Sequence, residues 1–190
     1  KEMKRNLVKI SSLALLAFLF SCSPVKVVTD QDKTVDFSQY KTYSFLGWQN
    51  DSDQIMSEFD KKRMHEAFLS EFTARGLEFV NEGGDMAVSL FIVVDQKTSV
   101  TAYTDYYGSG GYGYRRYGGG WGYGYSTTTY SESDYLQGTL VMDVFDTTSK
   151  DQVWQGVATS TVTEDPSKRE TSIPKKVAAL MKEFPVPVKE

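Results

Sequence analysis

The sequence predicts an α+β fold in which a mostly antiparallel sheet carries two amphipathic helices packed on one face. Two segments, 54–75 and 173–184, repeat apolar residues at helical spacing. A third, 135–164, has two alternating stretches separated by "DTTSKD", which is typical of a β-hairpin. Such helices bury their apolar stripes by packing on a sheet, so we expect one two-layer domain.

The N-terminus has the pattern of a secretory signal. Basic Lys4, Arg5 and Lys9 precede the unbroken apolar run 13–20, which is too short to span a bilayer. Residues 1–21 are therefore predicted to be a signal peptide, and 22–24 the start of the mature chain. Because the removed segment carries four basic residues and one acidic residue, the formal net charge falls from −4 to −7.

Cys22, the only cysteine, lies where the apolar run ends. The tetrapeptide "LFSC" resembles a bacterial lipobox, in which the cysteine is lipidated and the signal is cut before it. Two or more acyl chains anchor a protein stably, whereas one binds marginally. We expect lipidation at Cys22; the alternative is an ordinary signal peptide with a chance cysteine.

The predicted single α+β domain, residues 25–186, begins with strand patterns, and 187–190 form a tail. Val25, Val27 and Val28 predict a short strand, and Tyr43 and Phe45 alternate as in a half-buried strand. The run 86–100 is almost continuously apolar and β-branched, so we expect a strand covered on both faces.

Two helices complete the expected fold. The first, 54–75, is capped by Asp53 or Ser57 and ends at Gly76. Its apolar stripe is expected to contain Phe59, Met64, Ala67, Phe68 and Phe72. The second carries a stripe of Ile173, Val177, Leu180, Met181 and Phe184, with Pro174 in the first turn, where proline is tolerated, and Pro185 beyond its end.

A Gly/Tyr-rich stretch at 103–130 is expected to be a long loop between a strand ending near Thr101 and a hairpin starting near Tyr135. It holds nine of the 15 glycines and nine of the 12 tyrosines. Tyrosine and tryptophan offer large contact areas at low entropy cost. The interpretations are a low-complexity loop, a docking surface for an envelope protein or glycan, or self-association. The candidate binding residues are Tyr112, Tyr114, Arg115, Arg116, Tyr117, Trp121, Tyr123 and Tyr125.

Four landmarks, in order, resemble those of a large family of uncharacterised Gram-negative envelope lipoproteins built on one domain of unknown function. They are "DFSQYKTY" (36–43), "GTLVMDVFD" (138–146), "VWQG" (153–156) and a final helix ending in "FP" (184–185). The resemblance implies an α+β lipoprotein of the cell envelope and no assigned reaction. By analogy with lipoprotein sorting, Ser23 is not the acidic residue that favours retention in the inner membrane. We therefore expect an outer-membrane lipoprotein facing the periplasm.

The sequence contains no recognisable catalytic or metal constellation. His65, the only histidine, is expected on a helix surface, and one histidine with one lipidated cysteine cannot build a zinc site. Asp143 and Asp146 are expected to be structural turn residues rather than an acid/base pair. Gly108, Gly110 and Gly113 spell a dinucleotide motif, but glycines follow where its helix should begin. We expect no cofactor and no metal.

These observations favour a non-enzymatic, lipid-anchored periplasmic domain that binds an envelope partner or supports envelope integrity. A small-ligand or glycan binder using the aromatic stretch is the first alternative, and an unrecognised enzyme the second. Nucleic acid is not an expected partner, because the mature chain is acidic and the aromatic stretch carries a charge of only +1.

Overall fold

The computed structural model describes residues 25–106 and 126–189. Six strands form one sheet in the order β1-β6-β5-β4-β2-β3. Neighbours pair antiparallel except at β4-β2 and β2-β3, which are parallel. The elements are β1 (Lys26–Gln31), η2 (Phe37–Gln39), β2 (Thr42–Trp48), η3 (Gln49–Ile55), α2 (Glu58–Ala74), β3 (Glu78–Phe79), β4 (Met86–Tyr106), β5 (Ser126–Asp146), β6 (Gln152–Thr161) and α3 (Pro166–Met181).

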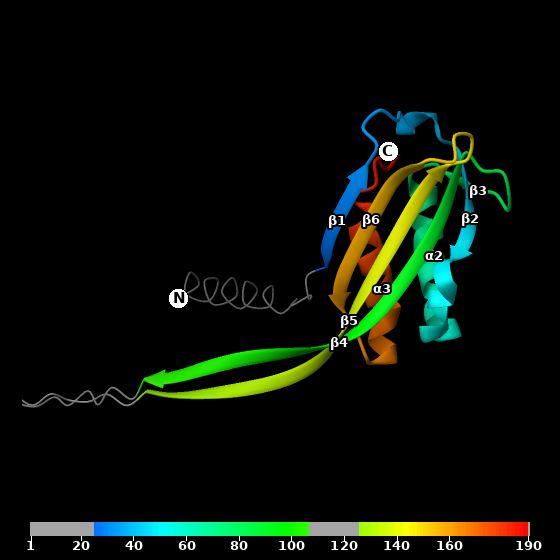
Figure 1. Ribbon diagram of the computed structural model, residues 1–190. Helices are drawn as coiled ribbons and strands as arrows, with labels where there is room; N and C mark the ends of the chain where they lie inside the picture. The colour runs from blue at the N-terminus through cyan, green and yellow to red at the C-terminus, as the bar shows by residue number, and fades with distance from the viewer. Residues whose placement is uncertain (1–24, 107–125, 190) are drawn as a thin grey trace, which may run out of the picture.

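The mixed class and the mostly antiparallel sheet agree with the sequence prediction. The predicted hairpin at 135–164 is the β5–β6 pair, and the short strand at 25–28 is β1. Helices α2 and α3 pack against each other, and Figure 1 shows them lying side by side along the sheet. The parallel edge formed by β2 and β3 was not predicted, because a two-residue strand leaves almost no alternation to recognise.

The core lies between the sheet and the two helices. Alternate residues of the central strands point into it, which is the period that a strand imposes on side chains. The largest fully buried side chains come from β4, β5, β6, α2 and α3: Trp154, Phe72, Met86, Met142, Leu180, Met181, Val144, Val153 and Val177.

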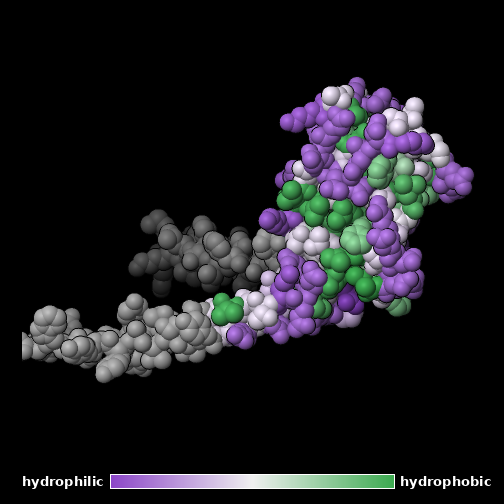
Figure 2. Space-filling view, viewed as in Figure 1, coloured by the Kyte–Doolittle hydropathy of each residue, from purple (hydrophilic) through white to green (hydrophobic). Residues whose placement is uncertain are grey.

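The intervening residues of the strands form a second apolar row. Val28, Val157, Val141 and Phe91 are register neighbours across β1, β6, β5 and β4. Figure 2 shows apolar side chains gathered across the middle of the sheet face that it presents. These side chains are half-buried or exposed, which distinguishes them from the core.

Strands β4 and β5 continue beyond the rest of the sheet as a two-stranded arm. Residues 96–106 pair with 126–136, past the ends of β2 and β6, and Figure 1 shows the arm projecting from the body. Asp134 accepts hydrogen bonds from Thr98 (2.7 Å) and Gln96 (3.2 Å) across it. The prediction of a strand covered on both faces over 86–100 was wrong, because residues 96–100 lie in this arm and because Val93, Val94 and Val100 are exposed.

Helix α2 begins later than the sequence suggested. Ser57 Oγ accepts a hydrogen bond from Asp60 N (3.2 Å), so Ser57 is the cap and the preceding residues form η3. Phe59 does not join the apolar stripe: it is 73% exposed, while its neighbour Asp60 is 7% exposed. The predicted role of Phe59 was therefore wrong, because Asp60 has arginine partners on the inner side of the helix.

Helix α3 begins earlier than predicted. It starts at Pro166, and Asp165 Oδ1 accepts a hydrogen bond from Ser167 N (2.9 Å) as its cap. Pro166 occupies the tolerated first turn, whereas Pro174 lies within the helix, so the placement of Pro174 in the first turn was wrong. The buried residues of α3 all belong to the predicted stripe: Ile173, Val177, Leu180 and Met181. The last residue of that stripe, Phe184, is buried just beyond the end of the helix.

Candidate functional site

The site residues predicted from the sequence lie outside the described part of the chain. Cys22 precedes residue 25, and the aromatic candidates Tyr112, Tyr114, Arg115, Arg116, Tyr117, Trp121, Tyr123 and Tyr125 fall within 107–125. At both ends of the Gly/Tyr-rich stretch the structure has strand where a loop was expected, because β4 runs to Tyr106 and β5 begins at Ser126.

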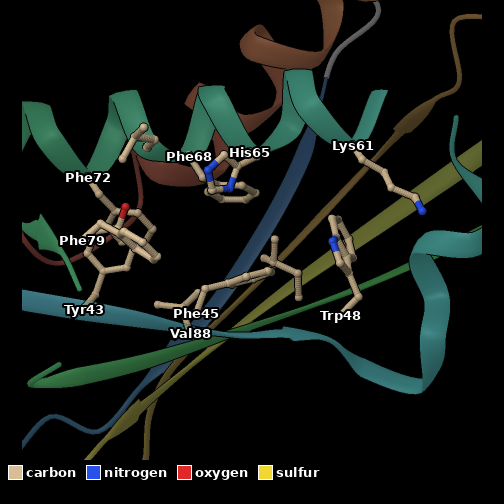
Figure 3. A pocket seen from close by; sticks show the side chains of 11 residues that line it. Tyr43, Phe45, Trp48, Lys61, His65, Phe68, Phe72, Phe79 and Val88 are labelled. Atoms are coloured by element: carbon tan, nitrogen blue, oxygen red, sulfur yellow. The ribbon is translucent and has the colours of Figure 1, made fainter. Parts of the chain in front are cut away.

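An aromatic groove between α2 and β2 is a site that the sequence did not reveal. It encloses about 50 Å³ (Figure 3). Helix α2 supplies one wall, because Lys61, His65, Phe68, Leu69 and Phe72 recur at spacings of three and four and share one face. His65 is exposed, as expected for a surface histidine, and Leu69 is 38% exposed at the rim.

Strand β2 supplies the floor. Tyr43 and Phe45 point to the same side by simple alternation, but Trp48 is three residues further on and should point away. A bulge between Phe45 and Gly47 corrects this, because it adds one residue on β2 relative to β4. Gly47 has φ +98°, which a residue with a side chain rarely adopts. Trp48 therefore rises toward α2 beside Phe45 (Figure 3).

The groove lies beside a strand edge that is only partly covered. β3 pairs with β2 at Thr42 and Tyr43 alone, and the last bond of this ladder runs from Val80 N to Tyr43 O (2.9 Å). Backbone groups alternate sides along a strand, so Phe45 presents its N–H and C=O at the same outer edge as Tyr43. Among the described residues, no backbone bond continues the ladder past Val80.

One end of the groove is charged. Lys61 Nζ lies 2.8 Å from Glu58 Oε1 and 3.0 Å from Asp53 Oδ2. The hydrogen bond with Glu58, followed by that with Asp53, raises the pKa of Lys61, so the amine stays cationic. The groove thus has an aromatic floor, an aliphatic rim and a fixed charge at one end.

The carboxylates that the sequence singled out make structural hydrogen bonds in the described residues. No group of three or more His, Cys, Asp or Glu side chains that could hold a metal occurs in 25–106 or 126–189. Asp146 is a turn residue, as expected: it accepts from Thr148 N, Ser149 N and the Tyr40 hydroxyl. The bond from Ser149 N is the main cause of its lowered pKa. Asp143 is not a turn residue, contrary to expectation: it lies within β5 opposite Gln155, and it accepts from Gln152 and Gln155, both at 2.7 Å.

Residues 27–186 match the family described as "Domain of unknown function (DUF4136)". The chain belongs to this family. No curated protein matches it. Within the described segments, no helix has both the length and the apolar character needed to cross a membrane.

Solved structures are only distantly similar to this DUF4136 domain. A PDZ domain protein from Parabacteroides distasonis has a TM-score of 0.49 and 14% identity, over 93% of this chain and 40% of that one. The PelC dodecamer from Paraburkholderia phytofirmans gives a TM-score of 0.46 and 9% identity, over 88% of this chain and 100% of that one. Neither likeness carries an argument about function.

The sequence landmarks of this DUF4136 domain are packing residues. Trp154 of "VWQG" is buried, and a Cβ at Gly156 would meet the indole ring, so the glycine makes room for Trp154. Phe184 of "FP" packs edge-on against the indole, with ring centres 5.2 Å apart. The Tyr40 hydroxyl donates to Asp146 (2.9 Å), which joins the first two landmarks. These contacts stabilise the fold.

Proposed function

We propose that this DUF4136 domain is a non-enzymatic lipoprotein domain of the Gram-negative cell envelope that binds an extended segment of a partner protein along β2. Cys22 anchors it to the outer membrane, and the domain faces the periplasm. The observation that carries the proposal is the aromatic groove lying beside the free edge of β2.

Adding a strand to a sheet edge is a general way to bind an extended peptide. Main-chain hydrogen bonds supply affinity, and pockets for alternate side chains supply specificity. Here the N–H and C=O of Phe45 offer the bonds, and Phe45, Trp48 and Leu69 form the pocket. A partner segment that places an aromatic or aliphatic side chain over Phe45 fits this arrangement.

The anchor would hold the groove near the membrane. Lys26, the first residue of β1, is four positions after Cys22 in the chain. An extended chain advances at most ~3.6 Å per residue, so β1 would begin within about 15 Å of the lipidated residue. A domain tethered this closely meets partners embedded in, or lying on, the periplasmic side of the membrane.

Photocrosslinking in whole cells tests the groove. A photoreactive phenylalanine analogue at His65, at the rim, should capture a partner whose identity and crosslinked peptide mass spectrometry reports. The same analogue at exposed Thr73, on the same helix outside the groove, is the control. Equal capture at both positions would contradict the proposal, as would crosslinking to glycan alone.

A peptide made from the captured segment then measures affinity. Leu69→Arg places a charge on the groove wall and should weaken binding at least tenfold. Phe59→Arg is the matched control, because Phe59 is an exposed apolar residue of α2 outside the groove. It should leave affinity within twofold. Equal losses in both variants would show that the groove is not the binding site.

Attachment through Cys22 has its own test. The intact mass of the chain purified from a membrane fraction should exceed the mass calculated for residues 22–190 by that of the attached lipid, and the Cys22→Ala variant should carry no lipid. An unmodified, soluble wild-type chain would refute the anchor and leave the groove experiments unaffected.

A further inference from the structure

A cavity of about 150 Å³ lies at the opposite end of the helix–sheet interface from the aromatic landmarks. Strands β4, β5 and β6 form its floor with Ile92, Leu140 and Ala158, and the first halves of α2 and α3 form its walls with Met64 and Ile173. A cavity of this volume lined by aliphatic residues can hold a group the size of benzene.

Two buried polar atoms line this apolar space without a hydrogen-bond partner among the described residues. They are Arg169 Nε and Ser172 Oγ. The residues are three apart on α3, so they project from the same face of the helix. A buried donor without an acceptor costs stability, and native structures contain few of them. One acceptor placed between the two would satisfy both.

The charge around the cavity selects an anion. Asp60 Oδ2 lies 3.2 Å from Arg169 Nε, although the two do not form an aligned hydrogen bond, and Asp60 Oδ1 accepts from Arg63 at 2.7 Å. Lys176, which also lines the cavity, donates to Thr161 O (2.7 Å). Two cationic side chains, Arg169 and Lys176, and one carboxylate, Asp60, therefore line the cavity.

We propose that this cavity binds a small monocarboxylate with an apolar tail of about six to eight carbons. The tail occupies the aliphatic space, and the carboxylate accepts hydrogen bonds from Arg169 Nε–H and the Ser172 hydroxyl. This site is separate from the β2 groove and does not require lipidation at Cys22.

Titration calorimetry with octanoate tests the proposal on the full chain carrying Cys22→Ala, which removes any lipid at that position. Octanoate should bind saturably. Arg169→Met removes the Nε–H while keeping an apolar stem, and should weaken binding at least tenfold. Arg63→Met is the matched control: Arg63 contacts the same Asp60 but does not line the cavity, so affinity should stay within twofold.

Three further measurements test the site if Arg169→Met fails to fold. Ser172→Ala should weaken octanoate binding several-fold, and octan-1-ol, which has the same tail without the charge, should bind at least tenfold more weakly than octanoate. Ala158→Leu, which fills the cavity floor, should abolish binding while the melting temperature is maintained. Absence of saturable binding, equal losses in both arginine variants or equal affinity for octanol would overturn the proposal.

Discussion

The two ends of the helix–sheet interface are packed in opposite ways. At one end rings interlock: Phe184 lies against Phe37, Phe72 and Trp154, with ring centres 5.2–6.3 Å apart. At the other end, the residues of the strands are small or aliphatic and leave the 150 Å³ cavity. Native interiors contain few voids of this size. The comparison indicates that the aromatic end stabilises the fold, while the cavity end leaves room for a ligand.

The largest effect is expected at Trp154, which is 1% exposed. Trp154→Ala should lower the free energy of unfolding by ~3–5 kcal/mol, because it removes the indole and leaves a void beside Phe184 and Gly156. Phe59→Ala, on the exposed side of α2, should change stability by ~0.5 kcal/mol or less. Chemical denaturation of both variants measures the difference. Similar losses would contradict the assignment of Trp154 to the core.

A matched pair of glycine substitutions compares the two ends directly. At Gly156 an added Cβ would meet the Trp154 ring and lie 2.7 Å from Leu180 Cδ1, so Gly156→Ala should cost ~1–3 kcal/mol by overpacking. At Gly138, beside the cavity, the nearest atom is the tip of Val162 at 3.1 Å. Gly138→Ala should therefore be neutral or stabilise by up to ~1 kcal/mol, because it restricts the unfolded chain. Equal destabilisation in a denaturant titration would show that both ends are filled.

The two arginines that join α2 to α3 offer a third comparison. Arg75, with a side chain 4% exposed, donates to Met181 O (2.6 Å) and to Glu71 at the aromatic end. Arg169, 25% exposed, reaches Asp60 at the cavity end. Arg75→Met should cost ~2 kcal/mol, since it removes the hydrogen bonds that this buried guanidinium donates to Glu71 and Met181. Arg169→Met should cost under ~1 kcal/mol, as partly exposed ion pairs contribute little. Thermal unfolding that ranks them in the reverse order would contradict the assignment of the stabilising role to the aromatic end.

The aromatic end was largely predictable from the sequence, because local patterns determine it. Alternation placed Tyr43 and Phe45 on one face, and the stripe of α3 identified Val177 and Leu180 as buried. The cavity was not predictable, since its lining comes from α2, α3 and three strands that meet only in the folded chain. The groove depends on a bulge at Gly47, and Trp48 could be placed only once that extra residue was known.

The errors in the sequence prediction have a common physical origin. Phe59 was assigned to the core on its apolar character and helical spacing, yet Asp60 is the buried residue, because Arg63 and Arg169 neutralise it from two helices. A periodic pattern records hydrophobicity and does not record partners that lie far along the chain. The same limit applies to the β4–β5 arm, where Val100 pairs opposite Glu132 and stays exposed.

The smallest effect should appear at alkaline pH. Burial raises the pKa of Tyr43 to about 12, above its ordinary value near 10. Because the folded state holds this proton more tightly than the unfolded chain does, the stabilisation is complete below pH 10 and is lost as the pH rises toward 12. Tyr43→Phe keeps the ring against Phe72, whose centre is 4.1 Å away, and removes the titration. Between pH 9 and 11, wild type should lose ~1 kcal/mol relative to this variant in denaturant titrations. Parallel stability profiles over that range would show that Tyr43 ionises equally in both states, and that the aromatic end admits water.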